Sequence, residues 1–363
     1  MSKKSLRSGI FCRTKMIKQF KILIIHPGGI GDLIMFTPAL QVLKNNFPDS
    51  AIDVFAGFTP VAAEVLRGSE IINKIFDFNF PKSSFFDKIN FILKLREEKY
   101  DLTIVAAGAN PLKASIFSFL INGRKSVGEY RKFKLPFYTH QVKLDGNQHK
   151  IRANLKLLKV LGITAEDVPP PFFALKNSDK QFAEEFILKN NLRNKILIGF
   201  SMGSGTAQQF KLWPSENFIE LGRKVLDNFP DAHILLFGSL SEKDICSKLQ
   251  NELKERVVPI IDKSLSQAAA LINKCKIFVS SDTGPCHIAA TTEADLIVIF
   301  GPTILERTGP VGPKVHIISE KCRYQYHDIF TPKYDIYKEH RCLEKITPER
   351  VFNKVKEILQ HER

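Results

Sequence analysis

Residues 21–40 read KILIIHPGGIGDLIMFTPAL, which is a short apolar run, a glycine-rich turn and the start of a helical pattern. The run at 21–25 is rich in β-branched residues, as expected for a strand buried on both faces of a parallel sheet. From Leu33 to Phe47 apolar residues recur at helical spacing, and Pro48 ends the pattern. A strand, a turn and a helix in this order form the unit of parallel α/β sheets. The stretch therefore predicts an α/β fold.

The same alternation occurs in two series, separated by a proline-rich segment. Residues 165–178 contain three consecutive prolines, which suits a stiff interdomain linker. Strands are predicted at 52–55 and 102–106 before the linker, and at 195–200, 233–238, 257–261, 276–281, 296–300 and 315–319 after it. Helices are predicted at 217–229, 243–253, 265–275 and 348–359. Two such sheets place ligands at the carboxyl ends of the strands and in the cleft between domains.

Length and charge narrow the class of protein. The 363 residues exceed the usual size of one core, so two domains are expected, and 29 phenylalanines predict aromatic-rich cores. The formal charge of +15 favours an anionic partner. No nucleic-acid-binding motif accompanies this charge, so we expect no nucleic acid as partner. The basic stretch from Arg124 to Lys134 fits a solvated face as well as a contact with an anionic membrane or acceptor.

Cysteine usage and the N-terminus bear on location. The six cysteines show neither a CxxC pair nor zinc-site spacing, and several lie in apolar segments, which predicts reduced core thiols in a cytosolic protein. Residues 1–19 are basic but lack the apolar region of a signal peptide. No apolar run approaches the roughly 20 residues needed to span a bilayer. We expect a cytoplasmic protein, with peripheral contact at the inner face of the cytoplasmic membrane as an alternative.

The first motif is HPGGIGD at 26–32, between strand and helix. Gly28, Gly29 and Gly31 allow main-chain N–H groups to approach an anion or an acceptor closely. The dinucleotide fingerprint GxGxxG is not met, and the acid about 20 positions on, Asp53, lies inside its strand rather than after it. Asp32 fits a helix N-cap as well as a general base at the cleft.

The second motif is SMGSGTAQQFKLWP at 201–214, again after a strand. Ser204 and Thr206 offer short hydroxyl donors and Lys211 a compact cation, which together suit a diphosphate. The GK[ST] end of a Walker A loop is absent. The alternative is an ordinary surface lysine before a helix.

The third motif is SSDTGPCH at 280–287, also between strand and helix. Main-chain N–H groups of Thr283 and Gly284 at a helix start would form an anion site. Asp282 alone fits an N-cap, and His287 alone fits a buried core histidine. Because two such loops follow strands of one sheet, we expect them to converge on one ligand.

Two further observations concern a possible ribose contact and a possible metal site. Glu242 follows a strand and could accept hydrogen bonds from a ribose, although an acid in the first turn of a helix is an equally ordinary explanation. The sequence has no Asp-x-Asp and no histidine cluster, so we expect no metal. Leaving-group charge would then be balanced by helix dipoles and Lys211.

Taken together, the motifs resemble those of the family 9 glycosyltransferases, typified by the ADP-heptose:lipopolysaccharide heptosyltransferases. The resemblance extends over residues 21–359. It rests on several motifs in the same order: GGIGDLIMFTPAL (28–40), KLWP (211–214), SSDTGPCHIAA (280–290), FGPT (300–303) and GPVG (309–312). The chain departs from the family at 292–295, where TEAD replaces a Gly-Thr-Pro-like turn, and in its basic N-terminal extension.

The resemblance implies a GT-B fold, in which two Rossmann-like domains face each other across a cleft. The expected parts are a basic extension (1–20), an acceptor-binding domain (21–168), a linker (169–180), a nucleotide-sugar-binding domain (181–345) and a C-terminal helix returning to the first domain (346–363).

The resemblance also implies the roles of the site residues. Asp32 would be the base that deprotonates the acceptor hydroxyl, beside the acceptor-side loop of Gly28, Gly29 and Gly31. The donor-side residues would be Lys211, Thr283 and Gly284 at the diphosphate, Ser204 and Thr206 in the same pocket, Asp282 at the sugar, Glu242 at the ribose and His287 behind the diphosphate loop.

The expected reaction is an inverting, metal-independent transfer of a sugar. The resemblance points to heptose from ADP-heptose as the donor and to a lipid-linked or oligosaccharide acceptor of the lipopolysaccharide core type. No cofactor is expected beyond the nucleotide-sugar co-substrate. Two alternatives stay open, a non-catalytic nucleotide-sugar-binding protein and a nicotinamide-dependent oxidoreductase. The oligomeric state and the identities of sugar, base and acceptor are not specified by the residues.

Overall fold

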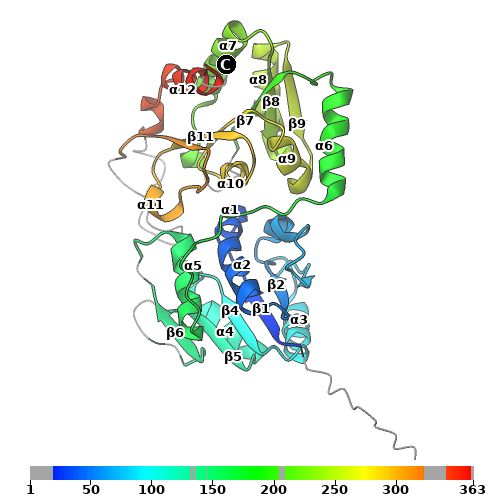
Figure 1. Cartoon of the computed structure of the whole chain (residues 1–363), viewed down its shortest axis with the longest axis vertical. Helices are drawn as coiled ribbons and strands as arrows, with labels where there is room; N and C mark the ends of the chain where they lie inside the picture. Colours follow the sequence, from blue (N-terminus) through cyan, green and yellow to red (C-terminus); the bar gives the residue numbers. More distant parts are fainter. Residues whose placement is uncertain are drawn as a thin grey trace, which may run out of the picture.

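The computed structural model describes residues 19–130, 134, 136–144, 146–203, 209–322 and 341–360. In this part of the chain, two six-stranded sheets lie one after the other along the long axis of the molecule (Figure 1). All strand pairings are parallel, as expected when helices form the crossovers. The predicted two-domain α/β architecture is confirmed.

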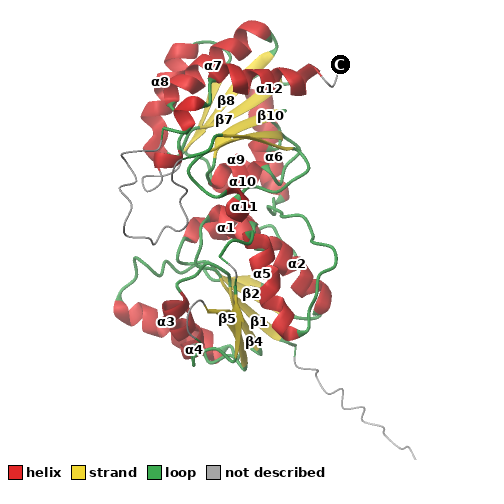
Figure 2. Ribbon diagram, turned by 90° about the vertical axis from the view of Figure 1, so that its left-hand side faces the viewer, coloured by secondary structure: helices red, strands yellow, loops and turns green. Residues whose placement is uncertain are grey.

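The first sheet has the strand order β3-β2-β1-β4-β5-β6. Helices α2 and α5 cover one face, and α3 and α4 cover the other (Figure 2). Its strands are β1 (Lys21–Ile25), β2 (Ala51–Phe55), β3 (Lys74–Ile75), β4 (Leu102–Val105), β5 (Lys125–Tyr130) and β6 (His140–Lys143). Its helices are α1 (Ile30–Ile34), α2 (Thr37–Asn46), η1 (Pro60–Leu66), α3 (Phe85–Glu97), α4 (Pro111–Ile121), α5 (Lys150–Leu158) and η2 (Lys159–Leu161).

The helix predicted from Leu33 to Phe47 is divided into α1 and α2. Pro38 is the second residue of α2, and a proline is tolerated only in the first turn of a helix because it has no N–H. The Thr37 hydroxyl donates to Ile34 O at 2.7 Å, where the two helices join. As a result, α1 is a separate short helix that carries Asp32.

The second sheet has the order β12-β11-β10-β7-β8-β9. Helices α7, α8 and α12 pack on one face and α6, α9 and α10 on the other. Its strands are β7 (Ile196–Ser201), β8 (Ala232–Gly238), β9 (Val257–Ile261), β10 (Ile277–Ser281), β11 (Asp295–Phe300) and β12 (Val315–Ser319). Its helices are α6 (Asn177–Lys189), η3 (Gln209–Lys211), α7 (Ser215–Asn228), η4 (Leu240–Glu242), α8 (Lys243–Leu253), α9 (Leu265–Ile272), α10 (Gly284–Ala289), α11 (Leu305–Thr308), η5 (Leu343–Lys345) and α12 (Pro348–Gln360).

The C-terminal helix differs from the expectation. Helix α12 does not return to the first domain but packs against α7 and the second sheet (Figure 1). Its apolar stripe is buried there, with Val351 and Val355 fully so. Trp213 also binds the segment that precedes α12, because its indole Nε1 donates to Ile346 O at 2.8 Å. The expected linker at 169–180 likewise ends inside the first turn of α6.

The two sheets are joined through apolar packing. One core cluster extends from the α2–α5 side of the first sheet to the α6–α9 side of the second. A separate aromatic cluster lies under α3 and α4, where the ring of Phe55 is 4.8 Å from that of Phe91 and 5.6 Å from that of Phe117. The prediction of aromatic-rich cores is confirmed for this face.

The cysteines follow the expectation only in part. Cys246, Cys275 and Cys286 are free and buried. Cys322 and Cys342, however, form a disulfide with their Cα atoms 5.2 Å apart, because the chain after β12 and the start of η5 meet beside the same core. Cys12 lies outside the described residues. No helix in the described part of the chain is long and apolar enough to cross a bilayer.

Candidate active site

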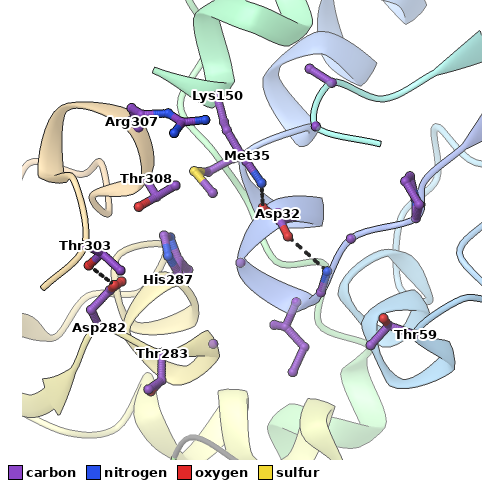
Figure 3. Close-up of a pocket in the computed structure, with 18 of the residues that line it drawn as sticks. Asp32, Met35, Thr59, Lys150, Asp282, Thr283, His287, Thr303, Arg307 and Thr308 are labelled. Carbon is purple, nitrogen blue, oxygen red and sulfur yellow. Dashed lines mark hydrogen bonds and ion pairs between the residues drawn. The ribbon is translucent and has the colours of Figure 1, made fainter. Parts of the chain in front are cut away.

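A cleft of about 410 Å³ lies between the carboxyl ends of the two sheets. Its first wall consists of the β1–α1 turn, α1 with Met35 after it, Thr59, the β4–α4 loop and the first residue of α5. Its second wall consists of Lys211, the β10–α10 turn and the segment from Thr303 to Thr308. Figure 3 shows Asp32 on one side, Asp282 and Thr283 on the other, and His287 between them.

Asp32 is the third residue of α1 and has two different partners. Its Oδ2 atom accepts the N–H of Gly29 at 3.1 Å, and Gly29 is the N-cap of the helix. Its Oδ1 atom accepts from Lys150 Nζ (Figure 3). Asp32 is therefore not the N-cap, but it caps the helix from its third residue with Oδ2, and Oδ1 is directed to the cleft.

The environment keeps Asp32 ionised. Burial on its own raises the pKa of this carboxyl, but the charge and hydrogen bond of Lys150, followed by His26 and the Gly29 N–H, lower it from 3.8 to about 2. His26 stays neutral near pH 7, because burial lowers its pKa to about 4. A carboxylate in this state can accept a hydrogen bond from a hydroxyl in the cleft.

Lys150 is a site residue that the sequence did not indicate. It opens α5, and His149 before it accepts the N–H of Ile151 with Nδ1 at 3.2 Å and contacts Gly309 O with Nε2 at 3.0 Å. A lysine in the first turn of a helix is disfavoured by the helix dipole. That unfavourable position was the one available signal, because Asp32 lies 118 residues away in sequence.

Across the cleft, α10 approaches α1 closely. A Cβ atom on Gly31 would lie 2.5 Å from His287 Cδ2, so only glycine permits this contact. His287 is buried, and burial lowers its pKa to about 4, although Asp282 and Asp32 oppose this effect. Gly284 faces Ile30 in the same interface. The imidazole is therefore a neutral spacer between the two walls.

Asp282 and Lys211 form a buried ion pair. Lys211 Nζ lies 3.2 Å from Asp282 Oδ2, and the two side chains are 14% and 5% exposed. Thr303 also donates its hydroxyl to Oδ2 at 2.6 Å. Asp282 thus holds the ammonium of Lys211 at the wall of the cleft.

The β10–α10 turn offers fewer N–H groups than expected. The N–H of Thr283 donates to Ser281 O at 2.8 Å, Pro285 has none, and the N–H of Cys286 donates to Thr283 O at 3.1 Å. Within this turn, the N–H of Gly284 therefore remains for an anion. Thr283 lines the cleft, but in this structure its N–H is engaged by Ser281 O.

Potential metal ligands also meet at this turn. In the described part of the chain, ligand atoms of Asp282, Cys286 and His287 lie within 4.8 Å of one another. Asp282 is already engaged by Lys211 and Thr303, and burial raises the pKa of the Cys286 thiol. As it stands, the group is an ion pair with its supporting side chains rather than a set of free ligands.

The structure thus brings most of the predicted site residues into one cleft. Those that line it are Gly28, Gly29, Gly31, Asp32, Lys211, Asp282, Thr283, Gly284 and His287. Glu242 does not line it: its Oε2 accepts from the N–H and hydroxyl of Ser239 at 2.7 and 2.8 Å in the first turn of η4. Ser204 and Thr206 lie outside the described residues.

Comparison with known proteins places the chain among glycosyltransferases. Residues 89–333 match a family model described as glycosyltransferase family 9 (heptosyltransferase). The chain is 27% identical over 365 residues to lipooligosaccharide heptosyltransferase 2 of Campylobacter jejuni, covering 94% of this chain and 99% of that protein. It is 25% identical over 359 residues to lipopolysaccharide heptosyltransferase 2 of Escherichia coli, with coverages of 94% and 99%.

Solved structures share the fold over nearly the whole chain. The E. coli ADP-heptose lipopolysaccharide heptosyltransferase II aligns with a TM-score of 0.76 at 21% identity, covering 95% of this chain and 100% of that one. A family 9 glycosyltransferase from Veillonella parvula aligns with a TM-score of 0.82 at 20% identity, with coverages of 94% and 98%. These similarities confirm the GT-B architecture.

Proposed function

The chain belongs to glycosyltransferase family 9 and is a glycosyltransferase, and from its cleft we propose that it transfers heptose from ADP-heptose onto a lipopolysaccharide core or related glycan. The relatives named above support the sugar and the acceptor class, because they are lipooligosaccharide and lipopolysaccharide heptosyltransferases and the E. coli structure is that of an ADP-heptose heptosyltransferase. We further propose that the transfer inverts the anomeric centre, needs no metal, and occurs in the cytoplasm at the inner face of the cytoplasmic membrane.

The observation that carries the proposal is the placement of a carboxylate opposite a cation in one cleft. Asp32 belongs to the wall built by the first sheet, whereas Lys211 and Gly284 belong to the wall built by the second. An acceptor hydroxyl on the first wall and a donor diphosphate on the second would then approach the reacting carbon from opposite sides. A displacement in that geometry inverts the configuration at the carbon.

In the reaction, the acceptor oxygen bonds to the anomeric carbon while its proton passes to Asp32. The bond from that carbon to the phosphate oxygen breaks, and ADP leaves. Lys211 and the Gly284 N–H would stabilise the developing charge on the diphosphate, as fixed charges and dipoles do at other leaving groups. No step in this scheme calls for a metal ion.

The ion pair with Lys150 limits the strength of Asp32 as a base. A carboxylate with a pKa of about 2 is fully ionised but is a weak base, and general bases work best with a pKa nearer the working pH. We propose that the acceptor hydroxyl takes the place of the Lys150 ammonium on Oδ1. The pKa of Asp32 would then rise at the moment when it receives the proton.

The test is Asp32→Asn, which keeps an oxygen for the Gly29 N–H but removes the base. Turnover with ADP-heptose and a soluble core oligosaccharide should fall by about 10²–10⁴, because a positioned base contributes that much. Donor affinity measured by calorimetry should stay within about twofold, since the donor is assigned to the other wall. The exposed Asp49→Ala is the matched control. Wild-type turnover in Asp32→Asn would contradict the base assignment.

A further inference from the structure

The outer surface of α3 and α4 is unusually apolar. Eight of the sixteen exposed large hydrophobic side chains among the described residues lie on these two helices. Phe86 is 76% exposed and Phe85 71% exposed, which are the two highest fractions of the sixteen. We call the following set the α3–α4 surface: Phe85, Phe86, Ile89, Leu93, Leu112, Ile116, Phe119 and Leu120.

The sequence of α4 shows why this surface is not an ordinary solvated face. The helix reads PLKASIFSFLI and is apolar on all sides. Its small polar residues Ser115 and Ser118 are buried against the sheet, while Leu112, Ile116 and Phe119 face outward. A helix that is apolar all round normally lies in a core or a membrane. At 11 residues α4 is too short to span a bilayer, which leaves an interface as its environment.

The charges on the α3–α4 surface favour an anionic partner. Residues 82–97 and 111–121 carry five basic side chains, Lys82, Lys88, Lys94, Arg96 and Lys113, and two acids, Asp87 and Glu97. The ammonium of Lys88 lies 5.4 Å from the Phe80 ring centroid, so its stem lies along the aromatic cluster. Apolar side chains surrounded by lysines are the composition of helices that lie in the headgroup region of anionic membranes.

A second copy of the chain suits this surface less well. In a twofold-symmetric dimer the same patch faces itself, so two surfaces that each carry more basic than acidic side chains would meet. A layer of anionic headgroups over an apolar interior matches both features of the surface.

The position of the surface relative to the cleft supports the same partner. Asn110 lines the cleft and is the N-cap of α4, so α4 begins at the cleft and Leu112 lies in its first turn. In parallel crossovers the helix runs opposite to its strands, which places the Phe85 end of α3 at the same edge of the sheet. Figure 2 shows α3 and α4 together on the side of the first sheet.

From these observations we propose that the α3–α4 surface docks the enzyme on an anionic bilayer, with the phenylalanines inserted among the headgroups. Docking there places the acceptor wall of the cleft within about 17 Å of the membrane, which is the length of the 11-residue α4 at 1.5 Å per residue. The inference rests on the proposed function in one respect, namely that the acceptor is anchored in that membrane. It identifies which surface meets the lipid.

The test is co-sedimentation of the full chain with vesicles of phosphatidylcholine containing about 30% phosphatidylglycerol. Phe85→Ser/Phe86→Ser should reduce the partition coefficient at least about tenfold, equivalent to about 1.4 kcal/mol. Lys82→Gln/Lys113→Gln should reduce it as well and weaken its dependence on salt. The control is Val168→Ser/Leu188→Ser, whose side chains are 49% and 54% exposed elsewhere, and it should bind as wild type.

Transfer to a delipidated, soluble core oligosaccharide separates this proposal from the proposed function. The phenylalanine variant should retain wild-type transfer, because its substitutions lie outside the cleft. Absence of transfer by the wild type would contradict the proposed function. The vesicle-binding experiment would still test the docking proposal independently. The docking proposal is wrong if the wild type ignores anionic vesicles or if the phenylalanine and control variants bind equally. It is also wrong if the phenylalanine variant merely converts a dimer into a monomer.

Discussion

Lys150→Met provides the sharpest check on the chemistry of Asp32. Methionine keeps much of the apolar stem of lysine but removes the ammonium that contacts Oδ1. The pKa of Asp32 is about 2 against an ordinary 3.8 because burial, which raises it, is outweighed by Lys150 together with His26 and the Gly29 N–H. That difference corresponds to roughly 2 kcal/mol in favour of the ionised form. Without Lys150, burial dominates, and we expect the pKa of Asp32 to rise above 3.8.

The assay is the pH dependence of kcat/KM for transfer to a soluble acceptor, with folding checked by circular dichroism at each pH. In the wild type, protonation of Asp32 produces no loss of rate down to about pH 4, since its pKa lies lower. In Lys150→Met, an acid limb should appear above pH 4. Near pH 8 the variant should retain turnover within about tenfold, unlike Asp32→Asn. Lys156→Met, on the same helix, is the matched control.

The free energy of unfolding of Lys150→Met provides a second measurement. A group whose pKa is lowered on folding stabilises the protein above its unfolded pKa and loses this contribution as the pH falls through its folded pKa. The wild type should therefore be more stable than Lys150→Met by roughly 2 kcal/mol at pH 7, and the difference should shrink below about pH 4. A variant with the pH profile and the unfolding free energy of the wild type would refute the assigned role of Lys150.

Two other predictions concern the walls of the cleft. Lys211→Ala should weaken ADP-heptose binding by roughly 10–100-fold, because a hydrogen bond to a charged group contributes about 1.5–3 kcal/mol. Calorimetry measures this affinity, with the surface variant Lys195→Ala as the control. Unchanged affinity would show that Lys211 does not bind the diphosphate. Gly31→Ala should cost about 1–3 kcal/mol and lower turnover, because its Cβ would overlap His287 and force α1 from α10. Gly29→Ala is its control, since a Cβ there has no neighbour within 4 Å, and equal melting temperatures for the two variants would contradict the close approach.

Local patterns were enough to predict the architecture. Short apolar runs located the strands of the second sheet to within a residue or two, and the prolines at 169–171 separated the two series. The motifs at 28–40, 211–214 and 280–290, in this order, indicated the family. Membership in that family decides for a glycosyltransferase over the two alternatives, an oxidoreductase and a non-catalytic binding protein. These features are readable because glycine turns and helical periods depend on neighbours in sequence.

The tertiary structure decided how those residues are used. Sequence spacing could not reveal that Lys150 contacts Asp32, that the Thr283 N–H is already engaged, or that Cys322 meets Cys342, because these contacts depend on how whole elements pack. The placement of α12 on the second sheet and the split between α1 and α2 have the same origin.

Helix α4 shows most directly what the sequence alone could not predict. Its sequence is apolar on every side, so its period cannot indicate which side is covered, and only the fold leaves Leu112 and Phe119 in the open. For this protein, the sequence alone determined the two α/β domains, the order of the motifs and the candidate base. The structure decided which groups contact that carboxylate, which N–H groups of the β10–α10 turn are already engaged and which face is left exposed. The physical reason is that the first set depends on neighbours along the chain, and the second on neighbours in space.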